Sequence, residues 1–478
     1  MLNYNQALDF IHGLNAFGTK LGLENITKLL EILGNPHKDM KIIHVAGTNG
    51  KGSTCAMIDS ILRSDGYKVG LYTSPYLEVF NERIQVNGKN ISDDDLARLT
   101  DKVQKAVFYM RENNIGSPTE FEVVTAIGFL YFYEQAVDFL VLEVGMGGRL
   151  DATNVVTPLV SVITPISFDH QEYLGNTLSA IAKEKCGIIK PGVPVVTSPQ
   201  EPEALQVIEE TCKNLNCRLL KVIGEESISK DFDLHDTATY KLVSDNDDGL
   251  IFDLKTPTEE FKNLEIHLIG RHQLSNAATA VTAVDVLNMH GIDIKREAIY
   301  AGLKNARWPG RLERISQKPL ILIDGAHNIA GIRTLKDALI RYYKDKKKIL
   351  VLGILKDKDY KEMLKEIVPI ADVVISTAPL SPRALNASEL ACTICEMLDE
   401  KTIEINDNDR QYILPGKVPA EIPIYSREKI EDALNLALSL INSKEDMIVF
   451  AGSLYMIGYV RTLIKDRLAS DTMTSKII

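Results

Sequence analysis

Short runs of apolar and β-branched residues alternate along the chain with longer segments whose apolar positions recur at helical spacing. The runs of the first half are KIIHVAG (41–47), DFLVLEVG (138–145), LVSVITPI (159–166) and VPVVTS (193–198). Those of the second half are LILIDGA (320–326), KILVLGI (348–354), ADVVIST (371–377) and DMIVFAGS (446–453). Strands that alternate with helices predict parallel sheets joined by crossover helices. We therefore expect an α/β protein in which the later set forms a second α/β unit.

The segment between the two sets, 218–267, has a different pattern. It is polar and contains short alternating pieces, TATYKLV and GLIFDLK, around SDNDDG, which predicts a small antiparallel addition to the first domain. HQLSNAATAVTAVDVL then predicts a helix, and the Pro-Gly pair in LKNARWPGRLE predicts a domain boundary near Asn305. The expected domains are 1–305, with a mostly parallel sheet, and 306–478, with a Rossmann-like α/β fold.

Composition limits the function classes. A length of 478 residues suggests two to three domains. A net charge of -11 argues against a general nucleic-acid or anionic-membrane binder. The most apolar segment, 123–133, is shorter than the roughly 20 residues that a membrane span needs. Six cysteines show no zinc-ligand spacing, and the start of the chain has no secretory pattern, so we expect a cytoplasmic protein. A monomer is the default expectation.

Residues 43–54, IHVAGTNGKGST, join a strand to a helix through a glycine-rich turn. Backbone N–H groups at such a helix start bind phosphate oxygens, and Lys51 would neutralise β- and γ-phosphate charge. The pattern departs from the common P-loop because Val45 replaces the first glycine and Gly52 follows the lysine. A flexible glycine-rich turn is the alternative interpretation. The residues predicted to contact a nucleotide here are Asn49, Gly50, Lys51, Gly52, Ser53 and Thr54.

Polar residues near the ends of other strands are candidates for a metal site. Glu143 lies inside the apolar run VLEV, where an unpaired charge is costly, and a carboxylate beside a P-loop is well placed for Mg²⁺. His170 follows the next strand in FDHQEYLG, although a lone histidine is often structural. Lys185 belongs to the lysine-rich IAKEKCGIIKPG, and Ser74 and Arg83 belong to YTSPYLEVFNERI. A solvated cluster and an ordinary surface loop are the alternatives for these two segments.

These motifs occur together and in order. They are HVAGTNGKGST, TSPYLEVFNERI, TEFE, LEVGMGGRLDATN, FDHQEYLG, IAKEKCGIIK, GRHQLSNA, WPGRLE and DGAHN. In this combination the chain resembles the folylpolyglutamate synthase/dihydrofolate synthase family of Mur-ligase-type ATP-dependent amide ligases. The resemblance runs from about Tyr4 to Tyr459, and the two departures in the phosphate loop are the variant of this family. It implies a two-domain enzyme that binds ATP and its substrates between an N-terminal P-loop domain and a C-terminal domain.

The resemblance also implies roles for individual residues. It matches four residues to ligands of Mg²⁺, of which two ions are expected: Ser74, Glu143, His170 and Lys185. Lys185 corresponds to a lysine that is carbamylated in the family, which gives its side chain a carboxylate-like end. The resemblance implies catalytic roles for Lys51, Lys185 and His327. Three more residues match ATP contacts: Asn276, Arg311 and Asp324. The substrate side comprises Arg83, Phe121, Glu122, Asp151 and Thr153, with Ser381 and Arg383 near the amino-acid site.

The implied reaction joins the amine of L-glutamate to the carboxylate of a folate through an acyl phosphate, with release of ADP and phosphate. Some members of the family also act on dihydropteroate, and SPTEFE is compatible with both acceptors. A ligase for a UDP-muramyl cell-wall precursor is the alternative within the superfamily, which TEFE and GGRLDATN disfavour. A nucleotide-binding scaffold without ligase chemistry is the alternative from another class. The role of the loop-like stretch 405–423 stays open.

Overall fold

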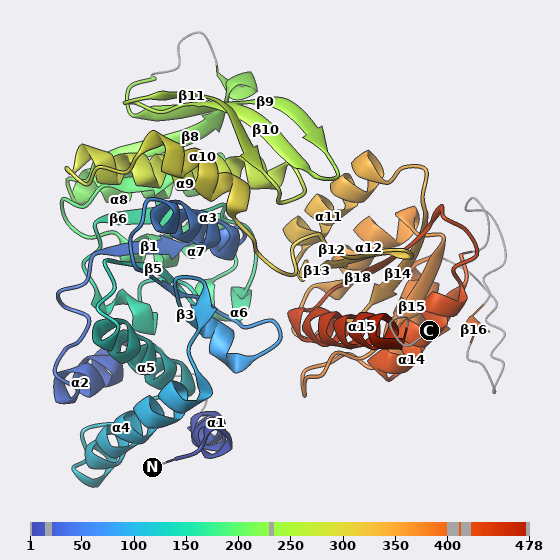
Figure 1. Cartoon of the computed structure of the whole chain (residues 1–478), viewed down its shortest axis with the longest axis horizontal. Coiled ribbons are helices and arrows are strands. Elements are labelled where there is room, and N and C mark those ends of the chain that lie inside the picture. The colour runs from blue at the N-terminus through green and yellow to red at the C-terminus, as the bar shows by residue number, and fades with distance from the viewer. Residues whose placement is uncertain (1, 15–21, 229–233, 399–410, 413–421, 475–478) are drawn as a thin grey trace. The chain divides into compact units, whose positions relative to one another are not determined.

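The computed structural model describes residues 2–14, 22–228, 234–398, 411–412 and 422–474 (Figure 1). The chain forms two compact units. The first comprises residues 1–245, 249–267 and 272–307, and the second comprises 246–248, 268–271 and 308–478. Most of the loop-like stretch 405–423 lies outside the described residues.

An 11-stranded sheet runs through the first unit in the order β11-β10-β9-β8-β7-β6-β1-β5-β2-β3-β4. The strands from β9 to β2 pair in parallel. They are β9 (Thr237–Asn246), β8 (Leu219–Gly224), β7 (Val195–Thr197), β6 (Val160–Ile163), β1 (Ile42–Ala46), β5 (Phe139–Glu143) and β2 (Val69–Tyr72). Antiparallel strands lie at both edges: β10 (Gly249–Lys255) and β11 (Glu260–Ile266) at one, β3 (Ile84–Val86) and β4 (Lys89–Asn90) at the other. This confirms the mostly parallel sheet with an antiparallel addition.

One detail of that addition differs from the prediction. Strand β8 lies inside 218–267 but pairs in parallel with β7 and with β9. The reason is helix α8 (Pro202–Asn214), which carries the chain back across the sheet so that β8 runs in the direction of β7. The alternating pieces of 218–267 predict an antiparallel addition, but alternation reports one exposed face and not strand direction.

Ten α-helices are described in the first unit. They are α1 (Tyr4–Gly13), α2 (Glu24–Ile32), α3 (Lys51–Ser64), α4 (Asp93–Glu112), α5 (Glu120–Glu134), α6 (Gln171–Leu174), α7 (Leu178–Lys185), α8, α9 (His272–Met289) and α10 (Arg296–Asn305). Short 3-10 turns are η2 (Phe80–Arg83), η3 (Ala152–Val155), η4 (Cys186–Ile188) and η5 (Glu225–Ser227). In the described part of the chain, no helix is both long enough and apolar enough to cross a membrane.

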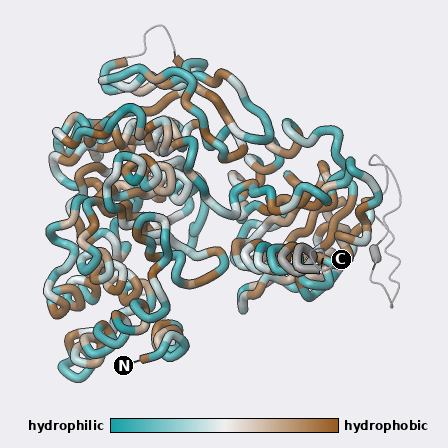
Figure 2. Tube along the Cα trace, in the orientation of Figure 1, coloured by the Kyte–Doolittle hydropathy of each residue, from teal (hydrophilic) through white to brown (hydrophobic). Residues whose placement is uncertain are grey.

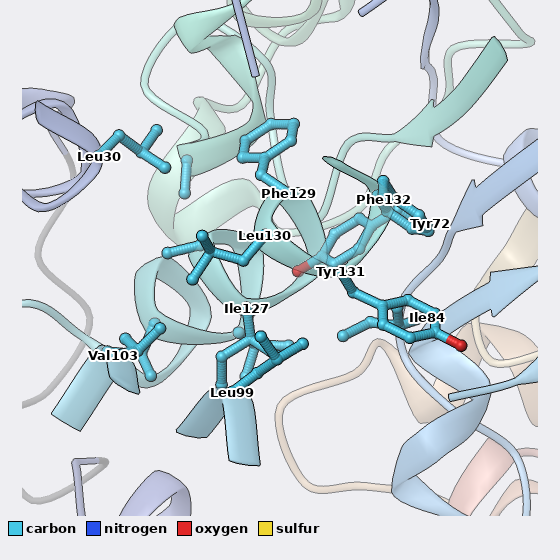
Figure 3. Close-up of a cluster of buried hydrophobic side chains, with 14 of the residues drawn as sticks. Leu30, Tyr72, Ile84, Leu99, Val103, Ile127, Phe129, Leu130, Tyr131 and Phe132 are labelled. Atoms are coloured by element: carbon cyan, nitrogen blue, oxygen red, sulfur yellow. The ribbon is translucent and has the colours of Figure 1, made fainter. Parts of the chain in front are cut away.

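Helix α5 is apolar around most of its surface because residues 122–132 are all buried. Figure 3 shows its side chains between Leu99 and Val103 of α4 and Tyr72 of β2. The contact with β2 is close: a Cβ added to Gly70 would lie 2.7 Å from the Phe132 ring. Figure 2 shows the same segregation along the chain, with hydrophobic residues concentrated in the strands and in the enclosed helices. The helix VVTAIGFLYFY is therefore a core helix, as its length predicts.

Helix α3, which follows β1, packs against α9 and α10, from the end of this unit's chain. The Ser60 hydroxyl donates a hydrogen bond to the Gly302 carbonyl at 2.7 Å. A Cβ at Gly302 would lie 2.3 Å from the Ile61 Cα, so the helices approach too closely for any other residue there. Residues 272–305 thus complete the environment of the helix that begins at the glycine-rich turn.

The second unit contains a seven-stranded sheet in the order β12-β13-β18-β14-β15-β17-β16. The strands are β12 (Glu313–Gln317), β13 (Leu320–Asp324), β14 (Lys347–Leu352), β15 (Val373–Ser376), β16 (Gln411–Tyr412), β17 (Ile424–Ser426) and β18 (Asp446–Ala451). The five from β13 to β17 pair in parallel. The helices are α11 (Ile329–Tyr342), α12 (Tyr360–Ile367), α13 (Ala387–Met397), α14 (Ile430–Ser439) and α15 (Leu454–Thr474), with η6 (Val368–Ile370). This confirms the predicted second α/β unit.

Candidate active site

The glycine-rich turn between β1 and α3 contains two glycines that have positive φ and close neighbours. Gly47 has φ +154°, and a Cβ there would lie 1.8 Å from the Thr164 hydroxyl oxygen. Gly50 precedes α3 with φ +84°, and a Cβ there would lie 2.4 Å from the Asn276 side-chain oxygen. The first turn of α3 therefore starts from a tight loop, with the exposed N–H groups and helix dipole that favour an anion.

The loop is also fixed from the strand beside it. The backbone N–H groups of Thr48 and Asn49 donate to the Pro165 carbonyl, which follows β6, at 2.9 and 3.2 Å. The Thr48 hydroxyl donates to the Ser167 carbonyl at 3.0 Å and accepts from the Ser167 N–H at 3.1 Å. Sequence reasoning missed this support, although TPIS directly precedes the FDH motif. These hydrogen bonds fix the conformation of the turn, which disfavours its interpretation as a flexible loop.

Lys51 is the first residue of α3, and its ammonium lies over the loop. It donates hydrogen bonds to the Gly47 and Thr48 carbonyls, each at 3.2 Å. Of the two predicted hydroxyl ligands, Ser53 is 3% exposed, while Thr54 is fully buried and its hydroxyl has no hydrogen-bond partner. The structure therefore places Lys51 at the loop surface and Thr54 in the interior of the helix packing.

Glu143 ends β5, which lies between β1 and β2, so its carboxylate emerges beside the glycine-rich loop. It is 4% exposed and accepts a hydrogen bond from the Ser74 backbone N–H at 3.2 Å. The structure thus brings together Glu143 and Ser74, two of the four predicted metal ligands. In the described part of the chain, no three His, Cys, Asp or Glu side chains form a metal-binding group. A site with one or two carboxylate-type ligands and substrate phosphates is the kind that Mg²⁺ uses.

Lys185, at the end of α7, is a buried lysine whose ammonium donates to the Gly47 carbonyl at 2.7 Å. Burial, together with the positive charge of Lys51, lowers the pKa of the Lys185 amine to about 7. The glycines of GMGGRLD permit this position: a Cβ at Gly148 would lie 2.9 Å from the Lys185 carbonyl oxygen. Of the three lysines in this segment, Lys183 is exposed and Lys190 is bonded to Asn154, so Lys185 alone reaches the loop.

His170 lies on the segment after β6, adjacent to β1 in the sheet. Its backbone is in the left-handed region, with φ +50°, and it precedes the short helix α6. The side chain is 40% exposed, and its Nε2 lies 4.0 Å from an Asp169 carboxylate oxygen. The structure therefore places His170 on the same edge of the sheet as Glu143, in a more exposed position.

The predicted substrate residues of the first unit fall into two environments. Arg83 lies over the Tyr76 and Phe80 rings, at 5.4 Å from each, and Phe121 packs against Gly145. Glu122, Asp151 and Thr153 are instead buried and hydrogen-bonded to other groups of the protein. Asp151 accepts from the Thr153 hydroxyl at 2.6 Å, and both side chains are buried.

Glu122 has a structural role that sequence reasoning missed. It caps α5, accepting from the Thr119 N–H at 2.7 Å, from the Thr119 hydroxyl at 2.9 Å and from the Ile26 N–H at 3.1 Å. The side chain is 4% exposed. Thr-x-x-Glu is the sequence signature of a capping box, so the signal was present in SPTEFE.

In the second unit, Asp324 ends β13 and organises the loop after it. Its carboxylate accepts from the N–H groups of Leu312 and Ala326 at 2.7 and 2.8 Å. Burial raises its pKa, an effect that the charge of Arg311 partly opposes. His327 holds its Nδ1 2.8 Å from the Gly325 carbonyl, so its Nε2 is the atom that points away from this contact. The unit thus groups Arg311, Asp324 and His327 around one strand end.

Ser381 and Arg383 lie elsewhere in the second unit, after β15. The Arg383 guanidinium pairs with Asp357 at 2.9 Å and is 51% exposed. The Ser381 hydroxyl accepts from the Arg383 N–H at 3.2 Å. The structure therefore brings these two residues together on an exposed loop.

Comparison with known proteins now adds to this geometry. Residues 45–284 match the family described as Mur ligase middle domain, and residues 310–454 match Mur ligase, glutamate ligase domain. The chain is a Mur-type ligase by both of its units.

A relative of known function shows which family of Mur-type ligases the chain belongs to. The chain is 42% identical over 389 residues to the dihydrofolate synthase/folylpolyglutamate synthase of Bacillus subtilis, an alignment that covers 81% of this chain and 88% of the relative. The chain therefore belongs to the folylpolyglutamate synthase/dihydrofolate synthase family, which confirms the resemblance identified from the motifs.

Solved structures agree with this assignment. A Mycobacterium tuberculosis folylpolyglutamate synthase complexed with ADP is 30% identical, with a TM-score of 0.83 over 97% of this chain and 99% of that one. A folylpolyglutamate synthase complexed with AMPPCP and folate is 31% identical, with a TM-score of 0.77 over 97% of this chain and 100% of that one.

Proposed function

We propose that the chain is an ATP-dependent ligase that adds L-glutamate to the carboxylate of a folate. A carboxylate is a poor acyl donor, and transfer of the γ-phosphoryl group of ATP converts it into an acyl phosphate with a good leaving group. The glutamate amine then attacks the acyl carbon, and the tetrahedral intermediate collapses to an amide and phosphate. Dihydropteroate is the second acceptor that we propose, which would make the enzyme a dihydrofolate synthase as well.

One observation supports this proposal most strongly. A buried lysine with a pKa near neutrality, Lys185, contacts the same glycine-rich loop that Lys51 covers, beside the buried carboxylate of Glu143. A nucleotide-binding scaffold has no need for a neutral amine and a desolvated carboxylate at its phosphate site. Charge neutralisation and alignment are what phosphoryl transfer demands of a protein.

The residues that we propose to hold Mg²⁺ are Ser74, Glu143, His170 and Lys185, the last as a carbamate. Three of the four donors fit the preference of Mg²⁺ for oxygen, namely the Ser74 hydroxyl, the Glu143 carboxylate and the Lys185 carbamate, while His170 would donate a nitrogen. When bound, Mg²⁺ neutralises charge on the phosphates of ATP. The near-neutral pKa of Lys185 supports the carbamate, because only an uncharged amine adds CO₂.

We propose that the protein itself performs three tasks around ATP. The α3 N-terminus and Lys51 bind phosphate oxygens, and Asn276, whose side chain lies against Gly50, contacts ATP. Arg311 and Asp324 of the second unit supply further contacts to ATP, and His327 lies in the active site. The substrate roles of Arg83, Phe121, Glu122, Asp151, Thr153, Ser381 and Arg383 stay predictions, as do the 1–305 and 306–478 division, the monomeric state and the cytoplasmic location.

ADP release with different acceptors tests the function directly. We expect tetrahydrofolate plus L-glutamate to raise the rate of ADP release at least about tenfold over ATP alone, a difference of roughly 1.4 kcal/mol in barrier. Dihydropteroate plus glutamate is expected to raise the rate of ADP release in the same way, because dihydropteroate is the second acceptor that we propose. A UDP-muramyl precursor is the control, and a response to it without a response to either pterin would overturn the proposal.

Gly50→Ala is expected to weaken ATP binding at least about tenfold, since the new Cβ meets Asn276 and distorts the loop. Gly66→Ala is the matched control, because Gly66 also has a positive φ, +95°, but nothing lies within 4 Å of a Cβ there. Titration calorimetry with ADP would measure both. Equal affinities in the two variants would show that the close contact at Gly50 does not matter for nucleotide binding.

A further inference from the structure

We propose that His44 is a positioning residue: it holds the loop 145–154, and through that loop it places Lys185 against the glycine-rich turn. His44 is the third residue of β1 and is fully buried in the centre of the sheet. The role of Lys185 in catalysis rests on the proposed function, but the contacts that link His44 to it do not.

The imidazole contributes one hydrogen bond of defined direction. Its Nε2 lies 2.9 Å from the Thr153 hydroxyl oxygen, whose single proton is donated to Asp151 at 2.6 Å. His44 must therefore be the donor in its own contact. Burial lowers the pKa of His44 to about 3, so the ring is neutral and keeps this proton at any working pH.

Asp151 then closes the loop. Its two carboxylate oxygens accept from the Thr153 N–H at 3.0 Å and from the Met146 N–H at 2.9 Å, which ties the two ends of the loop together. The Asp151 N–H donates to the Gly148 carbonyl at 3.2 Å. The loop is thus a compact unit attached to β1 through the imidazole of His44.

The closed loop supports the end of α7 at three points. The Arg149 N–H donates to the Glu184 carbonyl at 2.7 Å, and the Asn154 side-chain amide donates to the Gly187 carbonyl at 2.9 Å. Gly148 packs on the backbone of Lys185, with space for no Cβ. Lys185 then donates to the Gly47 carbonyl, three residues after His44, so the path of contacts begins on β1 and ends at the residue that follows it.

Removing the imidazole proton donor should loosen this path without touching the nucleotide loop itself. His44→Leu keeps a similar volume and leaves the Thr153 oxygen without its donor, whereas His44→Gln retains an N–H group. Hydrogen exchange of peptides covering 145–154 and 184–188 would report the opening of the loop, and steady-state kinetics would report its effect on turnover.

We expect exchange in both peptides to rise by about tenfold or more in His44→Leu, as for loss of one buried hydrogen bond. The kcat should fall by about tenfold, which is the smallest loss usual for residues that orient a ligand. The KM for ATP should stay within about twofold. His44→Gln should restore both. Ser376→Ala, which removes a buried hydrogen bond to the Ala387 carbonyl in the second unit, is the control and should change neither measurement.

Unchanged exchange in His44→Leu, or a loss that falls on the KM for ATP, would overturn the proposal. If His44→Leu does not fold, His44→Phe keeps a ring, also removes the donor to Thr153 and should reproduce the exchange result. The exchange measurement needs no substrate. A wild-type protein that ligates no glutamate would therefore refute the proposed function and still leave the exchange comparison to decide the role of His44.

Discussion

Lys51→Ala is expected to slow glutamate ligation at least about a hundredfold, equivalent to roughly 3 kcal/mol of transition-state stabilisation. The lysine lies over the glycine-rich loop and donates to the Gly47 and Thr48 carbonyls, so its charge is held at the loop where we propose that the ATP phosphates bind. Its loss would leave the negative charge that develops in the transition state with less compensation. The kcat for ADP release at saturating ATP, folate and glutamate measures the effect.

Lys348→Met is a matched control for this experiment. Lys348 donates to the Lys346 carbonyl at 2.7 Å, so it is also a lysine held by backbone oxygens, but it is 6% exposed and lies on β14 in the second unit. We expect it to lower thermal stability and to leave kcat within about twofold. Near-normal turnover in Lys51→Ala, or an equal loss in both variants, would contradict the assignment of the loop.

Lys185→Ala is the second variant with a large expected effect, a loss of activity of about a hundredfold. Lys183→Ala, two residues away and exposed, should remain within about twofold of the wild type. The difference follows from burial, since Lys185 contacts Gly47 and Lys183 faces solvent. Parallel measurement of kcat in both variants separates a specific role from a general effect of the lysine-rich segment.

The pH dependence of the wild type tests why Lys185 matters. Its pKa is lowered to about 7, so the amine is neutral above that pH and becomes charged as the pH falls through it. Only the neutral amine adds CO₂, and activity should therefore fall below pH 7 and recover in part with added bicarbonate. Lys185→Ala should show no bicarbonate response. An equal response in wild type and variant would exclude a carbamate at this position.

The apolar runs predicted the strands well because buried parallel strands must be apolar on both faces. KIIHVAG, DFLVLEVG and LVSVITPI became β1, β5 and β6, and the position of Glu143 at a strand end followed from the same pattern. Strand direction was harder to predict. Whether β8 runs parallel depends on the crossover helix α8 and not on the residues of β8 itself.

Contacts between segments that are far apart in the chain could not be predicted from patterns within short stretches of sequence. Asn276 meets Gly50, and His44 bonds Thr153, because the sheet brings together residues more than 100 positions apart. No spacing rule within one motif reports such pairs. The capping role of Glu122 is different, because the sequence contains the Thr-x-x-Glu pattern that predicts a capping box. The family resemblance assigned the same residues, TEFE, to a substrate pocket, and the capping role was therefore not predicted.

The packing of α3 on α10 has a consequence for synthesis on the ribosome. Ser60 and Gly302 are 242 residues apart in the chain, yet one donates a hydrogen bond to the other. At about 5–20 residues per second, roughly 10 to 50 s pass between the emergence of the two partners. During that interval the helix that carries the phosphate loop lacks its cover, so the nascent first unit should bind ATP only after α9 and α10 have left the exit tunnel.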